Sequence, residues 1–344
     1  MTPRLPGLRR RSRWKVPLLL AGAAAVAAAL VVQNRSRRAE REHPPSGRFV
    51  EVDGVRLHYV EKGEGAPLVL LHGLGTMGLD FLLSDLVEMA ARKYRVIVFD
   101  RPGHGHSERP RHGSASWDPQ VQARLLHGAL ERIGADRAIV LGHSWASLVA
   151  VSMALQHPGS VRSLVLEAGY HYPTFRADML LLAPPAVPVL GDFLRYTFAP
   201  LLLRASWPLF VKRMFAPAPV PARFWRFPAW MTARPSQLRA AAAESVEALA
   251  AAAALSKRYR QIRVPVVVLA GADDAVVDPF AHSERLHGDV RPSEFRLVPA
   301  MGHMLHHLVP ERVMEAIEAA AELGKAAPTR MLRRVPAYGP PHVA

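Results

Sequence analysis

Short apolar runs of strand length alternate along this chain with stretches that repeat apolar residues at helical spacing. Five of the runs contain almost no polar residue, a pattern typical of strands covered on both faces of a parallel sheet. They cover residues 67–71, 95–99, 138–141, 163–166 and 265–270. This alternation predicts parallel strands joined by crossover helices, because a buried parallel sheet needs helices over both of its faces.

Two segments before these runs alternate apolar and polar residues and flank Asp53-Gly54, which is a strong hairpin signal. Residues 295–298 supply an eighth strand, and helical patterns fill the intervals between the later runs. The strands of the hairpin are residues 48–52 and 56–60, and the helices are residues 79–92, 119–133, 145–157, 280–287 and 310–323. We therefore expect an α/β fold, an eight-stranded mostly parallel sheet that opens with an antiparallel hairpin.

One interval interrupts the alternation. Residues 168–263 contain no convincing strand, are rich in proline, leucine and aromatic residues, and include a strong helix former at residues 240–255. So long a stretch is too long for a structureless loop in a compact domain. It predicts a helical lid of about residues 171–260 inserted in a domain of residues 43–324.

The net charge of +15 belongs to the ends of the chain. Residues 1–41 carry +9 and residues 325–344 carry +4, so residues 42–324 carry only +2. A nearly neutral body with basic ends does not describe a nucleic-acid-binding surface. The basic tail, residues 325–344, is predicted to be disordered. The chain has no cysteine, which excludes disulfides, thiol catalysis and cysteine zinc sites.

The N-terminus contains an uncharged apolar segment, residues 16–32, that would form about 25 Å of helix. This is the short end of the transmembrane range and exceeds a typical signal-peptide core. Six basic residues precede the segment and four follow it, which favours an N-terminus inside and a body outside the cytoplasm. We expect an uncleaved anchor. A cleaved signal, for example at residues 27–29, is the alternative.

Gly142-His143-Ser144-Trp145-Ala146 lies where a buried strand gives way to a helix. A serine on such a sharp turn has a protruding hydroxyl, and the helix N-terminus behind it favours negative charge. The turn therefore makes Ser144 a candidate nucleophile, and an ordinary helix-capping serine is the alternative. A nucleophilic serine needs a histidine base, a carboxylate that orients it, and donors for an oxyanion.

Other strand ends supply these groups. The turn after residues 67–71 could aim the Leu74 backbone N–H at an oxyanion, with the Trp145 N–H as the second donor. Asp273, Asp274 and Asp278 follow residues 265–270, and His303, His306 and His307 follow residues 295–298. In an open parallel sheet, groups at these strand ends gather at one edge.

Taken in chain order, these motifs resemble the signatures of the α/β-hydrolase superfamily. They are His72-Gly73-Leu74-Gly75, residues 100–107, Gly142–Ala146, Gly271–Asp274 and Gly302-His303, and the match covers about residues 48–322. The resemblance implies Ser144 as nucleophile, His303 as base and Asp274 as its orienting acid. Ala146 departs from the pattern, because this turn usually has glycine there.

Each assignment has a rival in the sequence. Asp273 and Asp278 could be turn or capping residues or could replace Asp274, and Glu167 ends a strand where some hydrolases of this fold place the acid. His306 and His307 compete with His303. A metal bound by the histidines is not expected, and residues 103–107 are interpreted as a tight structural turn rather than a phosphate cradle.

Serine at the turn implies an acyl-enzyme, since haloalkane dehalogenases and epoxide hydrolases of this superfamily use aspartate there. We expect hydrolysis of a carboxylic ester without a cofactor. The many aromatic residues of the insertion and the membrane segment favour an apolar or lipid-like ester. Cleavage of a C–C bond, acyl transfer and a non-catalytic binding protein of the same fold are the alternatives.

Overall fold

The computed structural model describes residues 15–110 and 117–326, so most of the tail for which disorder was predicted lies outside the described residues. Eight strands form one sheet in the order β1-β2-β4-β3-β5-β6-β7-β8. The strands are β1 (Arg48–Val52), β2 (Val55–Lys62), β3 (Ala66–Leu71), β4 (Tyr94–Phe99), β5 (Ala138–His143), β6 (Val161–Glu167), β7 (Val266–Gly271) and β8 (Ser293–Val298). Strand β2 is antiparallel to β1 and β4, and all other pairs are parallel. The predicted fold class is confirmed.

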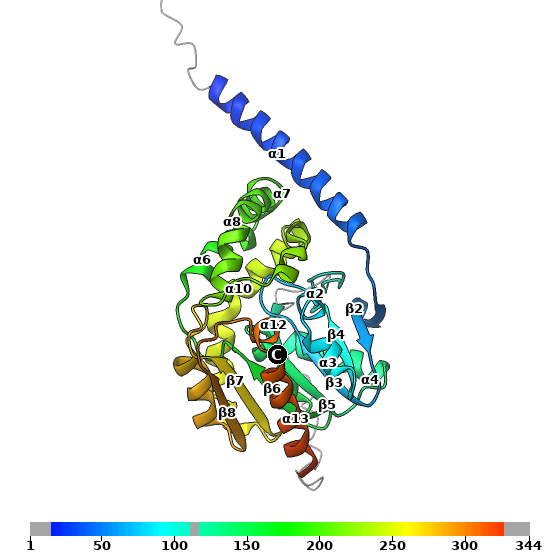
Figure 1. Cartoon of the computed structure of the whole chain (residues 1–344). Coiled ribbons are helices and arrows are strands. Elements are labelled where there is room, and N and C mark those ends of the chain that lie inside the picture. The colour runs from blue at the N-terminus through cyan, green and yellow to red at the C-terminus, as the bar shows by residue number, and fades with distance from the viewer. Residues whose placement is uncertain (1–14, 111–116, 327–344) are drawn as a thin grey trace, which may run out of the picture.

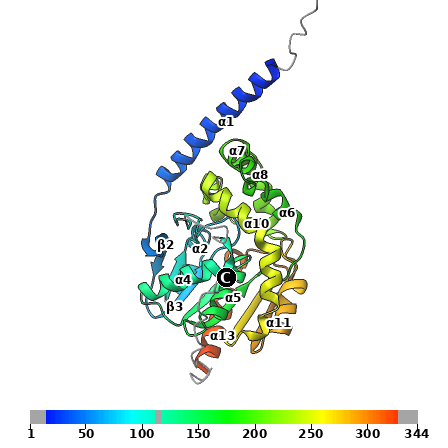
Figure 2. The same ribbon diagram turned by 180° about the vertical axis from the view of Figure 1, so that it is seen from behind.

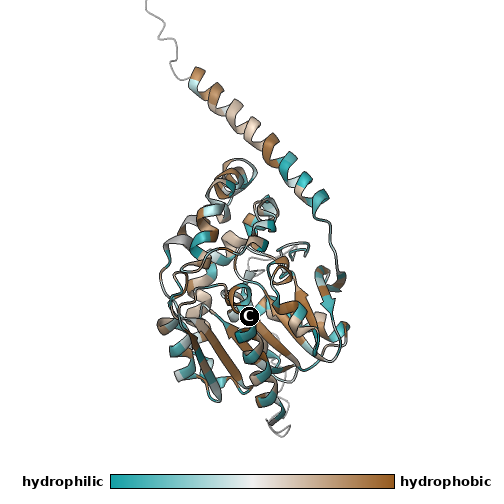
Figure 3. Cartoon of the chain, in the orientation of Figure 1, coloured by the Kyte–Doolittle hydropathy of each residue, from teal (hydrophilic) through white to brown (hydrophobic). Residues whose placement is uncertain are grey.

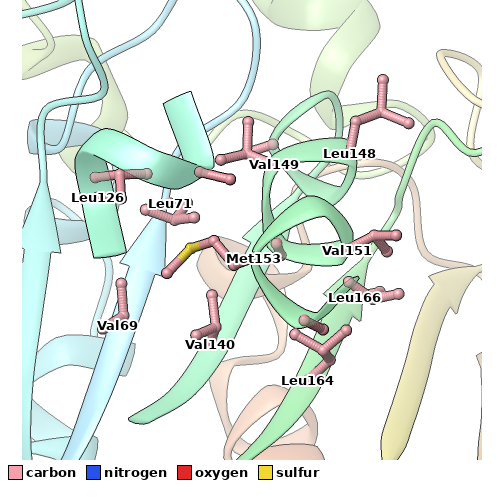
Figure 4. Packing of buried hydrophobic residues seen from close by; sticks show 14 of the residues in the cluster. Val69, Leu71, Leu126, Val140, Leu148, Val149, Val151, Met153, Leu164 and Leu166 are labelled. Carbon is pink, nitrogen blue, oxygen red and sulfur yellow. The ribbon is translucent and has the colours of Figure 1, made fainter. Parts of the chain in front are cut away.

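Helices cover both faces of the sheet (Figure 1). On one face, α4 (Pro119–Arg132) and α5 (Ala146–Gln156) pack on alternate residues of the central strands. Figure 4 shows Leu126 and Met153 beside Val69, Val140 and Leu164 in this cluster. The intervening residues face α3 (Leu86–Ala90) and α13 (Pro310–Ala326) on the other side. Burial on both faces explains why these strands are continuous apolar runs.

Local sequence explains the turns. Asp53 and Gly54 have φ values of 51° and 73°, the left-handed conformation that a two-residue hairpin turn requires. The helix predicted over residues 79–92 was wrong as a single element, because it is divided into α2 (Leu79–Leu82) and α3. The Ser84 hydroxyl and N–H both donate to the Phe81 carbonyl, which breaks the helical hydrogen-bond pattern.

The interval between β6 and β7 is helical in the structure. Its helices are α6 (Ala177–Leu182), α7 (Leu190–Tyr196), α8 (Phe198–Phe215), α9 (Ala229–Thr232) and α10 (Pro235–Ser256), with short 3-10 turns between them. They lie over the carboxyl ends of the parallel strands, as Figures 1 and 2 show from opposite sides. We refer to α6–α10 as the lid.

The first helix, α1 (Lys15–Glu42), continues ten residues past the uncharged segment. It is long and apolar enough over Val16–Glu42 to cross a membrane. Ala28, Val32 and Ala39 form a buried stripe along its second half, which packs against α7, α8 and α9. Figure 3 shows the apolar first half of α1 projecting beyond the lid and the polar second half approaching the body.

Candidate active site

Ser144 occupies the sharp turn between β5 and α5 with a φ of 56°. Non-glycine residues rarely adopt this conformation, and such strain concentrates at functional sites. The turn is held by hydrogen bonds from the Ser144 N–H to the Glu167 carbonyl (2.9 Å) and from the Tyr170 N–H to the Ser144 carbonyl (3.2 Å). A Cβ on Gly142 would lie 2.7 Å from the Ala146 carbonyl oxygen, so glycine is needed where β5 and α5 meet. Ala146 is accommodated, fully buried.

Asp274 and His303 form a buried pair beyond the ends of β7 and β8. The Asp274 Oδ2 atom lies 2.7 Å from His303 Nδ1, and Asp274 Oδ1 accepts the N–H groups of Val276 (2.7 Å) and Val277 (2.9 Å). Burial would raise the pKa of Asp274, but His303 and the two N–H donors outweigh it and hold the pKa below its ordinary value. Asp274 is therefore an ionised carboxylate that orients His303.

His143 links this pair to the serine turn. It precedes Ser144 in the chain, and its Nε2 atom lies 3.2 Å from the His303 carbonyl oxygen, to which it donates. The rings of His143 and His303 are 4.8 Å apart between centroids. Burial lowers the pKa of His143 to about 3, so it is neutral and keeps one donor for this bond. The bond fixes the His303 backbone beside the serine turn.

The loop after β3 lies against the same turn. A Cβ on Gly73 would be 3.2 Å from the Ser144 Cβ, so the Gly73-Leu74 backbone passes directly beside the serine. Among the hydrogen bonds of the described residues, none uses the backbone N–H of Leu74 or of Trp145. Both groups predicted to stabilise an oxyanion thus remain available as donors near Ser144.

The rival residues have other partners. Glu167 Oε1 accepts from the His306 N–H (2.9 Å) and lies 2.8 Å from His306 Nδ1 rather than near His303. Asp273 is exposed, and Asp278 Oδ1 caps the following turn through the N–H groups of Phe280 and Ala281. The structure therefore pairs His303 with Asp274 and gives Asp278 the capping role.

Sequence reasoning missed a buried network on α2, α12 (Leu305–Leu308) and β6. His306 Nε2 lies 3.5 Å from Asp80 Oδ1, and His307 Nε2 lies 2.9 Å from the same oxygen. Burial would lower the pKa of His306, but Glu167 and Asp80 raise it to about 10. The same contacts lower the pKa values of Asp80 and Glu167 despite their burial. The network therefore contains a protonated His306 between two carboxylates.

His306→Gln should destabilise the protein in a pH-dependent way. A raised pKa means that protonated His306 stabilises the fold fully below its ordinary value of 6.5 and loses this effect as pH rises through about 10. The loss of unfolding free energy in His306→Gln should thus be largest near pH 6 and shrink toward pH 10. Chemical denaturation at pH 6, 8 and 10 measures it.

His307→Gln is the matched control. The pKa of His307 is lowered, chiefly by burial, so its titration lies below its ordinary value. The free-energy difference of this variant should be flat between pH 8 and 10. If the free-energy difference of His306→Gln were also independent of pH between 8 and 10, a protonated His306 in this network would be contradicted.

Asp80, His143 and His306 bring potential metal ligand atoms within 4.8 Å of one another. The sequence did not indicate a carboxylate for a histidine cluster, but the fold brings Asp80 to these histidines from a distant part of the chain. Both ring nitrogens of His306 already face carboxylates, at 2.8 Å and 3.5 Å. Ion pairs of His306 with Glu167 and Asp80 therefore hold this group together.

A second buried network holds the loop after β3. Arg101, the second residue after β4, donates from Nε to the His72 carbonyl (2.8 Å) and from Nη2 to the Gly73 carbonyl (3.0 Å). Its guanidinium also pairs with Glu244 of α10, with a 3.0 Å contact from Nη2 to Oε2, and lies 4.8 Å from the centroid of the Trp145 ring. Arg101 therefore connects the loop, the residue after Ser144 and the lid. Glu244 lies 143 positions away, and nothing in the local sequence marks it.

Glu244→Gln should cost about 3–5 kcal/mol of unfolding free energy, because it leaves the fully buried Arg101 charge uncompensated. Denaturant titration of the detergent-solubilised full chain measures this. The exposed pair Arg312–Glu315 provides the control, since Glu315→Gln should change stability by less than about 0.5 kcal/mol. Equal effects of the two variants would contradict the structural role of Glu244.

Residues 103–107, interpreted from the sequence as a tight structural turn, lie in a turn region in the structure, with a hydrogen bond from the Ser107 N–H to the His104 carbonyl (2.9 Å). Asp100 Oδ1 accepts the Gly78 N–H (2.7 Å), and its Oδ2 accepts the His106 N–H (2.8 Å). The same Oδ2 lies 2.8 Å from His58 Nδ1. The Asp100 carboxylate thus connects the turn to β2 and to the start of α2.

The family model of the alpha/beta hydrolase fold matches residues 66–310, and the chain belongs to this family. Haloalkane dehalogenase 2 of Mycobacterium tuberculosis is 25% identical over 288 residues, which cover 80% of this chain and 94% of that protein. The membership agrees with the sheet order, the strained serine turn and the position of the Asp274–His303 pair.

Two solved structures have the same fold. An esterase from Thermogutta terrifontis has a TM-score of 0.62 at 21% identity and covers 81% of this chain and 99% of its own. A membrane phospholipase A, described as a bacterial virulence factor, has a TM-score of 0.61 at 23% identity and covers 92% of this chain and all of its own. That coverage exceeds the share of the chain after residue 42, so the likeness extends into the N-terminal region.

Proposed function

We propose that this protein is a serine hydrolase that cleaves a carboxylic ester through an acyl-enzyme on Ser144. The observation that carries the proposal is the 2.7 Å contact of Asp274 with His303, which His143 holds beside the strained Ser144 turn. An ionised Asp274 fixes the Nδ1–H tautomer of His303 and leaves Nε2 free to accept a proton.

In the proposed reaction, His303 Nε2 takes the proton of the Ser144 hydroxyl as its oxygen attacks the ester carbonyl carbon. The N–H groups of Leu74 and Trp145 stabilise the oxyanion of the tetrahedral intermediate. His303 then protonates the leaving alcohol, and the acyl group remains on Ser144. Water, deprotonated by His303, attacks the acyl-enzyme, and the acid leaves with restoration of Ser144.

Serine at the turn favours ester chemistry over the reaction named for the dehalogenase relative. Displacement of halide from an alkyl carbon requires a nucleophile whose alkylated product water can later cleave. A carboxylate forms such an ester, whereas a serine hydroxyl would form an ether that hydrolysis does not reverse. Serine at position 144 instead forms acyl esters that water can cleave. We therefore propose ester hydrolysis, in line with the esterase and the phospholipase among the similar structures.

We further propose that α1 is an uncleaved anchor with its N-terminus inside, and that the substrate is apolar or lipid-like. The uncharged residues 16–32 and the flanking basic residues support the anchor. Three exposed aromatic side chains support the apolar substrate: Phe193 and Phe198 of the lid, and Trp225 between α8 and α9. Other aromatic side chains of this region, Trp207, Phe215, Phe224 and Phe227, are buried and form its packing core.

Labelling with a fluorophosphonate tests the nucleophile, since it phosphonylates a serine activated by a histidine. The detergent-solubilised full chain should be labelled, with the adduct located on Ser144 by peptide mass spectrometry. A panel of esters, haloalkanes, epoxides and C–C substrates of the diketone type then identifies the reaction. An unlabelled wild type would overturn the nucleophile, and turnover of only a C–C substrate would replace the ester by the second chemistry.

A further inference from the structure

The tip of the lid exposes large apolar side chains beside α1. They lie on or next to α7 and α8, which stand at the same end of the molecule as α1 in both views (Figures 1 and 2). Val189, Leu202 and Leu209 are 82%, 71% and 74% exposed. The set, here called the lid tip, is Val189, Leu190, Phe193, Phe198, Leu202 and Leu209. Contiguous apolar exposure of this kind marks a surface that meets another apolar phase or partner.

The packing of α1 on the lid determines where the lid tip lies relative to the bilayer. A bilayer core of about 30 Å needs about 20 apolar residues, so all of residues 16–32 are required for crossing. Ala28 and Val32 belong to that segment, yet both are buried against the lid. The part of the lid that covers them must therefore reach the edge of the hydrocarbon layer that α1 enters.

Basic side chains without ion-pair partners among the described residues lie just beyond the apolar segment of α1. Arg35 lies one turn after Val32, at about the height of lipid headgroups. A cavity of about 360 Å³ between α1 and α8 has basic, acidic and aromatic side chains in its lining, among them Arg35, Arg38, Arg204, Glu42, Trp207, Trp225 and Trp230. Arg38 pairs with Glu42, but within the described ranges neither Arg35 nor Arg204 has an ion pair. Tryptophan and arginine together suit the interface between lipid tails and anionic headgroups.

We propose that the lid tip is embedded in the membrane that α1 crosses and that the Arg35–Arg204 cavity binds the headgroup of an anionic phospholipid. This inference rests on the proposed anchor, and it implies that the substrate comes from the bilayer. An ion pair between Arg234 Nη1 and Glu40 Oε1 (3.1 Å) ties α1 to the lid and maintains their alignment. Lipid can then reach the site beneath the lid without crossing water.

The absence of cysteine from the chain allows a direct test. Single-cysteine variants Val189→Cys, Leu202→Cys and Leu209→Cys are labelled with a polarity-sensitive fluorophore and reconstituted as full chain in vesicles. Leu297→Cys on β8 and Glu322→Cys on α13, both exposed and remote from α1, are the controls. Lid-tip labels should emit at shorter wavelength, be quenched by spin-labelled lipid and resist aqueous iodide.

The controls should show the reverse pattern. Lid-tip labels quenched by iodide as strongly as the controls, in protein that resists carbonate extraction, would overturn the embedding and leave the anchor intact. Extraction of the full chain by carbonate would instead overturn the anchor. Neither readout depends on catalysis, so failure of the proposed ester chemistry is separately visible.

The headgroup site is tested with phosphatidylcholine vesicles that do or do not contain phosphatidylglycerol. In chains that keep both arginines, spin-labelled lipid should quench the lid-tip labels more strongly when the vesicles contain phosphatidylglycerol. The double variant Arg35→Gln/Arg204→Gln should not show this increase. Arg124→Gln, an exposed arginine on α4, is the matched control and should retain it. An increase that persists unchanged in the double variant would overturn the headgroup site.

Discussion

Ser144→Ala should lower kcat/KM for an activated ester by a factor of about 10⁴–10⁶ and abolish fluorophosphonate labelling. The reason is that no other group supplies the acyl-accepting oxygen, and removal of a nucleophile or base typically costs this much. The residual rate over water should persist, because the Leu74 and Trp145 donors and substrate binding remain. Steady-state kinetics of the purified full chain measures the loss.

Stability separates this result from misfolding. Alanine has the same left-handed strain as serine at a φ of 56°, so the unfolding free energy should change by less than about 1 kcal/mol. Ser152→Ala provides the control, since that buried hydroxyl on α5 donates only to the Leu148 carbonyl. This control should keep activity within a few-fold. A Ser144→Ala variant with near-normal turnover would contradict the acyl-enzyme.

Asp274→Asn should reduce kcat by about 10⁴-fold while leaving the fold intact. The amide oxygen can still accept the Val276 and Val277 N–H groups. Its NH₂ would then face His303 Nδ1 and donate to it, which moves the ring proton to Nε2. His303 can no longer accept the serine proton in that tautomer, and this error typically costs about four orders of magnitude.

Asp278→Asn and Glu167→Gln distinguish Asp274 from its rivals. Asp278 caps a turn, and its amide variant should retain activity within a few-fold. Glu167→Gln should lower stability through His306 but leave fluorophosphonate labelling at the same pH largely unchanged. Wild-type kinetics in Asp274→Asn together with a large loss in Glu167→Gln would transfer the acid role to Glu167.

The sequence predicted those features that local pattern determines. Parallel buried strands are continuous apolar runs, so their positions could be found within a few residues, and the Asp53-Gly54 turn identified the hairpin. Candidate residues at strand ends could also be placed together, because parallel strands bring their carboxyl ends to one edge. The pairing of His303 with Asp274 rather than Glu167 needed the structure, since all the candidates end strands or follow them directly.

Long-range charge pairing could not be predicted. Glu244 lies in an alanine-rich helix, where a glutamate is ordinarily an exposed helix former, and Asp80 begins a short helix. Only the tertiary fold brings them to Arg101 and His306. The packing of α1 on the lid was equally hidden, because the buried residues Ala28 and Val32 are apolar like the rest of the uncharged segment around them.

The Arg101–Glu244 pair limits which part of the lid can move. Withdrawal of α10 from the body would leave a guanidinium and a carboxylate without partners in positions closed to water, at a cost of about 3–5 kcal/mol. No comparable buried pair joins α7 or α8 to the body among the described residues. The buried pair therefore fixes α10 against the body, and a motion of the lid that admits substrate should leave α10 in place.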